Sequence, residues 1–83
     1  MERETAFETV RRHLTRQFEL PPEKVTPEAH LFEELELDSI DALDMISLME
    51  TELGMAVVEE ELKTIRTVED VVQYLVRHAP EKK

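Results

Sequence analysis

The most restrictive feature of this sequence is its helical periodicity, which is broken at only a few points. Apolar residues recur at spacings of three and four through most of the chain, as one buried face of an α-helix requires. The breaks fall at prolines and at Gly54, the only glycine. The pattern predicts an all-α fold, a small four-helix bundle of three main helices and one short helix.

The first helix is expected from Thr5 to about Glu19. Its apolar stripe consists of Phe7, Val10, Leu14 and Phe18. Leu20-Pro21-Pro22 then stops the helix, because proline cannot donate a helical hydrogen bond. The loop that follows, up to Leu37, is long for a compact domain, so its apolar residues are expected to hold it against the core. These residues are Val25, Leu31, Phe32, Leu35 and Leu37.

The second helix is expected to start at Ser39 and to end near Gly54, a natural left-handed C-terminal cap. At 100° per residue, one side of it can be buried. That side holds Ala42, Leu43, Ile46, Met49 and Leu53, and the methionines at 45 and 49 are expected to fill the core. A second stripe mixes polar and apolar groups, as a docking surface does. It consists of Ile40, Asp44, Ser47, Leu48 and Thr51.

The remaining helices follow in the last third of the chain. A short one is expected from about Glu59 to Thr64, where Val58, Leu62 and Ile65 keep helical spacing. Thr67 and Asp70, three residues apart, predict a capped start for the last helix. Its apolar residues are Val68, Val71, Val72, Leu75 and Val76, and Pro80 and the tail end it. With the long loop between the first two helices, residues 1–83 are expected to form one domain.

Composition narrows the possible functions. A chain of 83 residues buries too little surface for a large internal active site, so we expect no catalytic residues and a non-enzymatic role. Without cysteine the chain has no thiolate nucleophile and no sulfur-based zinc site, so thiol chemistry would need an attached group. No apolar stretch approaches the ~18 residues of a membrane span, and the N-terminus lacks the layout of a signal peptide. A cytoplasmic monomer is expected.

Charge is strongly segregated along the chain. The net charge is −10, yet residues 25–62 contain 12 acidic residues and no lysine or arginine, while the remainder has 8 acidic and 10 basic residues. Such a one-sign surface repels nucleic acid and anionic membranes and attracts basic protein surfaces. A solvated face without a partner is the alternative. Because these acids surround an exposed serine, we favour a protein partner with a basic surface.

That serine, Ser39, lies between two aspartates where the long loop turns into the second helix. Asp38 is a good N-cap residue and Asp41 falls three positions later, which leaves Ser39 exposed on the first helical turn. A hydroxyl in this place can be an attachment point. An ordinary capped helix is the alternative interpretation of these residues alone.

Four segments in order resemble the acyl carrier protein family over nearly the whole chain. They are residues 31–35 (LFEEL), 37–41 (LDSID), 49–54 (METELG) and 65–71 (IRTVEDV). The resemblance implies that Ser39, flanked by Asp38 and Ile40, receives 4′-phosphopantetheine from coenzyme A through a phosphopantetheinyl transferase. The thiol of this arm would hold acyl intermediates as thioesters for fatty-acid, polyketide or related lipid biosynthesis.

The resemblance also implies a partner-binding surface, because the family's enzymes present arginine and lysine to the second helix. Acyl-loading, condensing and tailoring enzymes would contact Asp41, Asp44, Ser47, Leu48, Glu50 and Thr51, with Ile40 beside them, and the third helix would add Glu59, Glu60 and Glu61. Three positions depart from the family. Glu36 replaces a usual glycine, which puts a positive-φ loop geometry in doubt. Ser47 and Thr51 replace a common methionine and glutamate, which suggests a specialised pathway.

Three other functions were weighed against this one. A peptidyl or aryl carrier would share the fold, but its usual Gly-Gly-[His/Asp]-Ser motif is missing here. An acidic adaptor switched by phosphorylation of Ser39 is the alternative from a different class. A calcium site is disfavoured, because Asp38, Asp41 and Asp44 recur every third position rather than at alternate ones, and no metal site is expected. The histidines 13, 30 and 78 form no triad spacing and are expected at the surface.

Overall fold

The computed structural model describes residues 2–55 and 59–79, with the backbone only at Glu59. Within these ranges the chain forms α1 (Arg3–Phe18), α2 (Ser39–Leu53), α3 (Glu59–Leu62) and α4 (Val68–His78), and a 3-10 turn, η1, covers Pro22–Lys24. The described residues contain no strand, only an isolated bridge between His30 and Thr67. The predicted all-α fold of three long helices and one short helix is confirmed.

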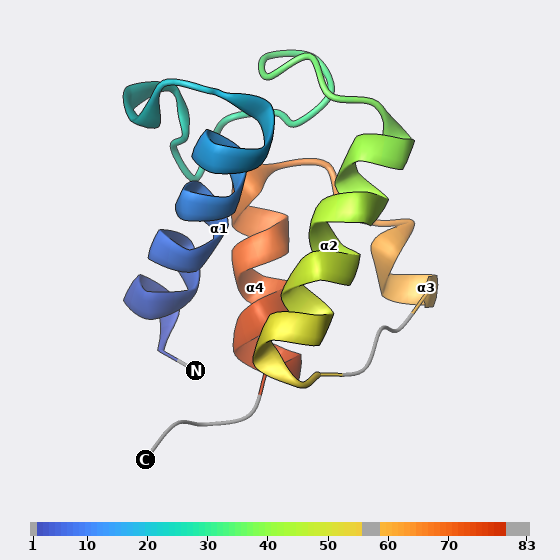
Figure 1. The fold of residues 1–83 in the computed structure, drawn as a ribbon. Coiled ribbons are helices and arrows are strands. Elements are labelled where there is room, and N and C mark those ends of the chain that lie inside the picture. Colours follow the sequence, from blue (N-terminus) through green and yellow to red (C-terminus); the bar gives the residue numbers. More distant parts are fainter. Residues whose placement is uncertain (1, 56–58, 80–83) are drawn as a thin grey trace.

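The helices lie as a bundle with the long loop over one end (Figure 1). In this view α4 stands between α1 and α2, and the short α3 lies outside α2. α1 packs most extensively against α4 and touches α2 much less. The molecule therefore has a closely packed side, made by α1 and α4, and a more open side, made by α2 and α3.

The core is formed where the apolar stripes of the long helices meet. Residues without any solvent exposure come from all three of them: Ala6, Val10 and Leu14 of α1, Met45 and Met49 of α2, and Val68, Val71, Val72, Tyr74 and Leu75 of α4. The long loop adds Val25, Leu31, Leu35 and Leu37, which are buried, and Phe32, which is half-buried. These five loop residues hold the loop on the bundle, as the sequence predicts.

Backbone hydrogen bonds fix the loop to the segment that precedes α4. The amide of Leu31 donates to the carbonyl of Arg66 over 2.9 Å, and the amide of Val68 donates to that of Ala29 over 3.0 Å. Residues 29–31 of the loop are thereby held beside residues 66–68.

The helix ends differ from prediction by one or two residues. α1 starts at Arg3, two residues early, because the amide of Ala6 donates to the Glu2 carbonyl over 2.8 Å and closes one more turn. It ends at Phe18, where Glu19 takes the left-handed conformation before the prolines. α3 ends at Leu62 instead of Thr64, because the last two bonds there are turns, from Thr64 to Glu61 and from Ile65 to Leu62. Val58 and Pro80 lie outside the described residues.

The predicted buried face of α2 is correct at three positions and wrong at one. Ala42, Ile46 and Met49 are buried. Leu53 is only partly buried, and Leu43 is 49% exposed. Leu43 lines a pocket on the open side of the molecule instead of contacting the core. On α4, Val76 follows the apolar pattern but is 38% exposed.

Candidate functional site

Ser39 is the first residue of α2, and its side chain is exposed. Asp38 caps the helix: its Oδ1 accepts from the amide of Asp41 over 2.8 Å, and Asp41 Oδ2 accepts from the amide of Asp38 over 3.3 Å. This reciprocal capping box satisfies two backbone donors that the helix start would otherwise leave open. Both flanking carboxylates are thus used in the cap, and the hydroxyl of Ser39 makes no hydrogen bond within the described part of the chain.

The loop reaches Ser39 through a residue in the left-handed region. Glu36 has a φ of 59°, which side chains with a Cβ rarely adopt. The next residue, Leu37, is buried, and its amide donates to the carbonyl of Leu31 over 2.9 Å. The loop geometry that Glu36 put in doubt is therefore present, because these contacts hold the turn.

A pocket of about 370 Å³ opens beside Ser39, between α2 and the segment that runs from α3 to α4. Its α2 wall consists of Ser39, Ala42, Leu43 and Ile46. The opposite wall consists of Leu62, Lys63, Ile65 and Arg66, and Phe32 of the long loop closes one end. Six of these nine residues are apolar, so the pocket suits a hydrocarbon chain better than a polar ligand.

Charges of opposite sign lie around this pocket: two cations line one wall, and two carboxylates lie next to Ser39 outside the lining. Asp38 and Asp41 stand beside Ser39 at the start of α2. Lys63 and Arg66 are exposed on the facing wall. The Arg66 guanidinium is held in place by its Nη1, which donates to the carbonyl of Lys63 over 2.8 Å and to that of Ile65 over 3.1 Å. Sequence patterns gave no signal that these two cations lie close to Ser39.

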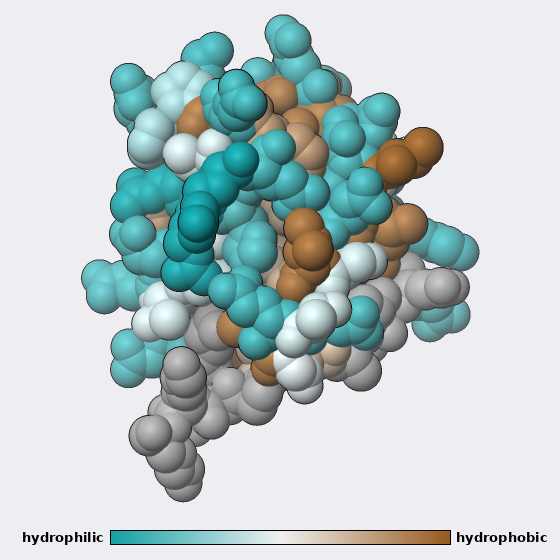
Figure 2. Space-filling model, in the orientation of Figure 1, coloured by the Kyte–Doolittle hydropathy of each residue, from teal (hydrophilic) through white to brown (hydrophobic). Residues whose placement is uncertain are grey.

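The second stripe of α2 is exposed, as a docking surface requires. Ile40 is 67% and Leu48 51% exposed, and Asp44 and Ser47 are exposed beside them. Figure 2 shows hydrophobic surface gathered over the α2 side of the molecule, whereas the α1 side is mainly hydrophilic. Exposed apolar side chains that gather on one face, with polar residues around them, are typical of an interaction site.

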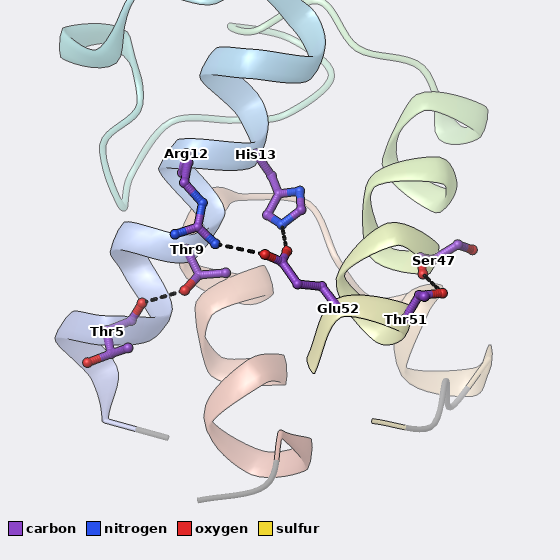
Figure 3. Close-up of polar contacts among 7 residues, drawn as sticks. All are labelled: Thr5, Thr9, Arg12, His13, Ser47, Thr51 and Glu52. Carbon is purple, nitrogen blue, oxygen red and sulfur yellow. Dashed lines mark hydrogen bonds and ion pairs between the residues drawn. The ribbon is translucent and has the colours of Figure 1, made fainter. Parts of the chain in front are cut away.

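Two further residues of this surface have backbone or side-chain partners. Thr51 donates its hydroxyl to the Ser47 carbonyl over 3.3 Å, within α2 (Figure 3). Glu50 is partly buried and also takes part in a polar interaction.

The three acids of α3 differ in how free they are. Glu60 is exposed, and the side chain of Glu59 lies outside the described part. Glu61 turns to α4, where Arg77 Nη2 and His78 Nε2 each lie 2.7 Å from its carboxylate oxygens. The hydrogen bond from Arg77, with a smaller one from His78, lowers the pKa of Glu61 against the opposing effect of burial. Glu61 therefore joins α3 to α4.

A similar contact joins α1 to α2 (Figure 3). Glu52 Oε1 lies 2.6 Å from His13 Nε2, and Glu52 Oε2 accepts from Arg12 Nη2 over 3.2 Å. The histidines are thus partly buried and bonded, not simple surface residues as predicted. In His30 the ring Nδ1 accepts from the amides of Phe32 and Glu33, each over 3.2 Å. None of these contacts involves Ser39.

The described residues contain neither a metal-binding group nor a membrane-spanning helix. These residues contain no group of three or more histidine, cysteine or acidic side chains that could hold a metal ion. None of their helices is long and apolar enough to cross a membrane.

Known proteins are similar in sequence to this chain over most of its length. A family model described as the phosphopantetheine attachment site matches residues 8–75. The acyl carrier protein 2 of Ralstonia nicotianae is 47% identical over 66 residues, which cover 80% of this chain and 82% of that protein. The acyl carrier protein of Saccharopolyspora erythraea is 38% identical over 73 residues, covering 88% and 77%.

Solved structures agree with these sequence matches. The crystal structure of an acyl carrier protein from Thermotoga maritima superposes with a TM-score of 0.78 at 28% identity, over 93% of this chain and 89% of that one. The acyl carrier protein of Enterococcus faecalis gives a TM-score of 0.76 at 26% identity, over 95% and 100%. The likeness covers nearly the whole of both chains, so it concerns the complete bundle.

Proposed function

This chain belongs to the acyl carrier protein family, and we propose that Ser39 is the residue that receives its 4′-phosphopantetheine arm. Members of the family hold acyl intermediates on this arm for enzymes of lipid or polyketide synthesis. The observation that supports the assignment to Ser39 is an exposed hydroxyl on the first turn of a capped helix, beside an apolar pocket.

The attachment requires little from the chain itself. In the proposed reaction the Ser39 oxygen forms a bond to the phosphorus next to pantetheine. The bond from that phosphorus to the oxygen that bridges the two phosphates of coenzyme A breaks, and adenosine 3′,5′-bisphosphate leaves. A transferase would remove the hydroxyl proton, because no base contacts Ser39 within the described residues. The chain's part is to present the hydroxyl rigidly, and the capping box and the buried Leu37 do this.

The pocket next to Ser39 offers a place for the cargo. In our proposal the acyl chain packs against its apolar walls, especially against Leu43 and Ile46. The chain would be removed from water when the arm folds back into the pocket. The pocket's volume of about 370 Å³ lies within the range of ligand pockets.

The proposal extends to partners and to the role of the whole chain. The carrier would act without catalysing a reaction, as one domain and as a monomer in the cytoplasm. Its partners would be the transferase and acyl-loading, condensing and tailoring enzymes with basic surfaces. They would dock on the exposed stripe of α2, where Asp44 supplies charge and Ile40 and Leu48 supply apolar contact. Glu60 would add charge from α3, and the replacements Ser47 and Thr51 would select enzymes of a specialised pathway.

The attachment site can be tested with a matched pair of variants, because the chain has only two serines. Wild type, Ser39→Ala and Ser47→Ala are incubated with coenzyme A and a broad-specificity phosphopantetheinyl transferase, and intact masses are measured. We expect one phosphopantetheine on wild type and on Ser47→Ala, and none on Ser39→Ala. An adduct on Ser39→Ala, or none on wild type, contradicts the assignment. A phosphate on Ser39 in protein from the native host would instead support the phosphorylated adaptor.

The docking surface can be tested by measuring association and dissociation rates with a partner enzyme. Asp44→Lys should mainly slow association of the loaded carrier with a basic condensing enzyme, and Glu23→Lys, an equal charge change on η1, is its control. Ile40→Ala should mainly speed dissociation, and Val76→Ala, another exposed apolar residue, on α4, is its control. If each variant matches its control, docking does not use this stripe.

A further inference from the structure

We propose that Lys63 and Arg66 form an anion-binding rim on the pocket beside Ser39, and that they hold an oxyanion of the attached arm or of its cargo. The inference rests on the proposed attachment at Ser39. It assigns a ligand class to the wall opposite α2, whose role the sequence patterns did not predict.

The first argument is that neither cation pairs with a described carboxylate, although the chain has an excess of acid. The protein has 20 acidic and 10 basic residues, so most basic side chains can find a carboxylate. Among the described residues, four arginines do so: Arg3, Arg11, Arg12 and Arg77. Neither Lys63 nor Arg66 makes an ion pair with the described carboxylates. Their positive charge is therefore not neutralised by any carboxylate that the structure describes.

The second argument is the position of the two cations. Residues 25–62 contain no lysine or arginine, so Lys63 is the first basic residue after the acidic region. Both cations line the pocket that Ser39 also lines. The guanidinium of Arg66 is oriented by the Lys63 and Ile65 carbonyls through Nη1 alone, which leaves its remaining N–H groups for an anion.

The third argument is the field that an attached phosphate would meet. Asp38 and Asp41 stand on the same side as Ser39 and repel a negative group joined to its oxygen. The facing wall attracts it. A phosphodiester on Ser39 would therefore lean across the pocket mouth to Lys63 and Arg66, and the arm would start out over the apolar walls.

The ligand chemistry has two sources, because a carboxylate at the end of an acyl chain could also bind these cations. The phosphodiester is fixed close to Ser39 in every loaded form. A cargo carboxylate reaches the rim only when the arm folds back. The two sources are separated by changing the cargo while the arm stays the same.

The first arm of the test uses the carrier without cargo. Melting temperatures are measured before and after attachment for wild type, for the double variant Lys63→Gln/Arg66→Gln and for Arg16→Gln. Arg16 is an exposed arginine that makes no ion pair with the described carboxylates and lines a separate hollow on α1, so it is a matched control. If the phosphodiester binds, attachment changes the melting temperature about 2–5 °C more favourably in wild type than in the double variant. The phosphorus NMR signal should also differ between these two proteins, and Arg16→Gln should match wild type.

The second arm compares two six-carbon cargoes, hexanoyl and adipoyl, of which only adipoyl ends in a carboxylate. If the cargo carboxylate binds, adipoyl should stabilise wild type relative to hexanoyl by a similar shift, and the double variant should lose the difference. A response in either arm supports the rim and names its ligand.

Failures of the two proposals are distinguishable. If intact mass shows full attachment at Ser39 and the double variant behaves as Arg16→Gln in both arms, the rim is wrong while the carrier function stands. If no attachment occurs on wild type, both proposals are overturned.

Discussion

α2 and α4 begin with the same cap and then diverge. In α4 the Asp70 carboxylate accepts from the amide of Thr67 over 3.1 Å, and the Thr67 hydroxyl accepts from the amide of Asp70 over 3.2 Å. Asp38 and Asp41 make the equivalent pair in α2. The first residue after the cap is Val68 in α4, which is fully buried, and Ser39 in α2, which is exposed. The same cap therefore starts both helices. Only in α2 is the first residue after the cap exposed, so that an enzyme could reach its side chain.

The same contrast continues along both helices. Most apolar residues of α4 are buried against α1 and the loop, whereas α2 leaves Ile40, Leu43 and Leu48 at the surface. α4 and α1 thus place most of their apolar side chains in the core. α2 contributes Met45, Ile46 and Met49 to the core and, in our proposal, also supplies surfaces for cargo and partners together with α3. This division leads to four predictions of decreasing size.

The largest effect is expected from truncating one leucine on each helix. Leu75→Ala removes a fully buried side chain of α4 and should lower the free energy of unfolding by about 2–5 kcal/mol. Leu48→Ala, on the exposed stripe of α2, should change it by less than about 0.5 kcal/mol. Urea unfolding followed by circular dichroism measures both. Equal losses would mean that Leu48 is buried in solution and that the exposed stripe of α2 is wrong.

The stability costs of removing the two caps should differ by less than those of the two leucine truncations. Thr67→Ala and Asp38→Ala each remove a capping box and should cost roughly 0.5–2 kcal/mol. We expect Asp38→Ala to cost less, because it also removes one charge from the acidic region, and added salt should narrow the gap. Thermal unfolding at two salt concentrations tests this. A larger cost for Asp38→Ala at low salt would contradict the idea of charge repulsion around Ser39.

A glycine in the loop before α2 should raise the stability of the fold, whereas the segment before α4 offers no such position. Glu36 has a positive φ, and no described residue in the segment before α4 has one. Glu36→Gly should be more stable than Glu36→Ala by about 0.5–1 kcal/mol, because both variants remove the charge and only glycine tolerates this φ. Chemical denaturation of the pair decides. Equal stability would show that the loop relaxes to a negative φ.

The smallest effect concerns the contact between α3 and α4. The pKa of Glu61 lies below its ordinary 4.5, mainly because Arg77 donates to it. The stability from this lowered pKa is complete above the ordinary value and is lost as the pH falls through the folded one. The melting temperature of Glu61→Gln should thus lie below that of wild type near neutral pH, and the gap should close in acid.

Melting curves over a pH series measure this gap. Glu60→Gln, which removes the exposed neighbouring charge, is the control and should show no such closing gap. A gap that stays constant down to strong acid would mean that the Glu61 contact does not depend on its charge.

Local signals were the ones that the sequence made predictable. Both caps were predicted because each needs only two residues three positions apart, and Gly54 ends α2 with a φ of 69° as expected. Ser39 was singled out because its motif lies within one such local frame. Its role as the attachment site remains a proposal.

Long-range features were missed for a physical reason. Leu43 was expected in the core because a helical wheel gives one apolar side and cannot tell which part of it a neighbour covers. The pairing of Glu52 with Arg12 and His13 joins residues about 40 positions apart, with no pattern in between. The pocket that Lys63 and Arg66 share with Ser39 is formed by segments far apart in the sequence, and the loop bonds that hold residues 29–31 beside residues 66–68 are also long-range.

The division between a packed side and a working side can be tested by NMR before and after phosphopantetheine attachment. Amide shifts of 15N-labelled protein should change most at Ser39 and its neighbours in α2, at Leu43 and Ile46 along the pocket, and in residues 62–66. The amide shifts in the middle of α1 and α4 should hardly change, because no residue of the pocket beside Ser39 lies there. The largest changes in α1 or α4, with residues 62–66 unaffected, would contradict the account.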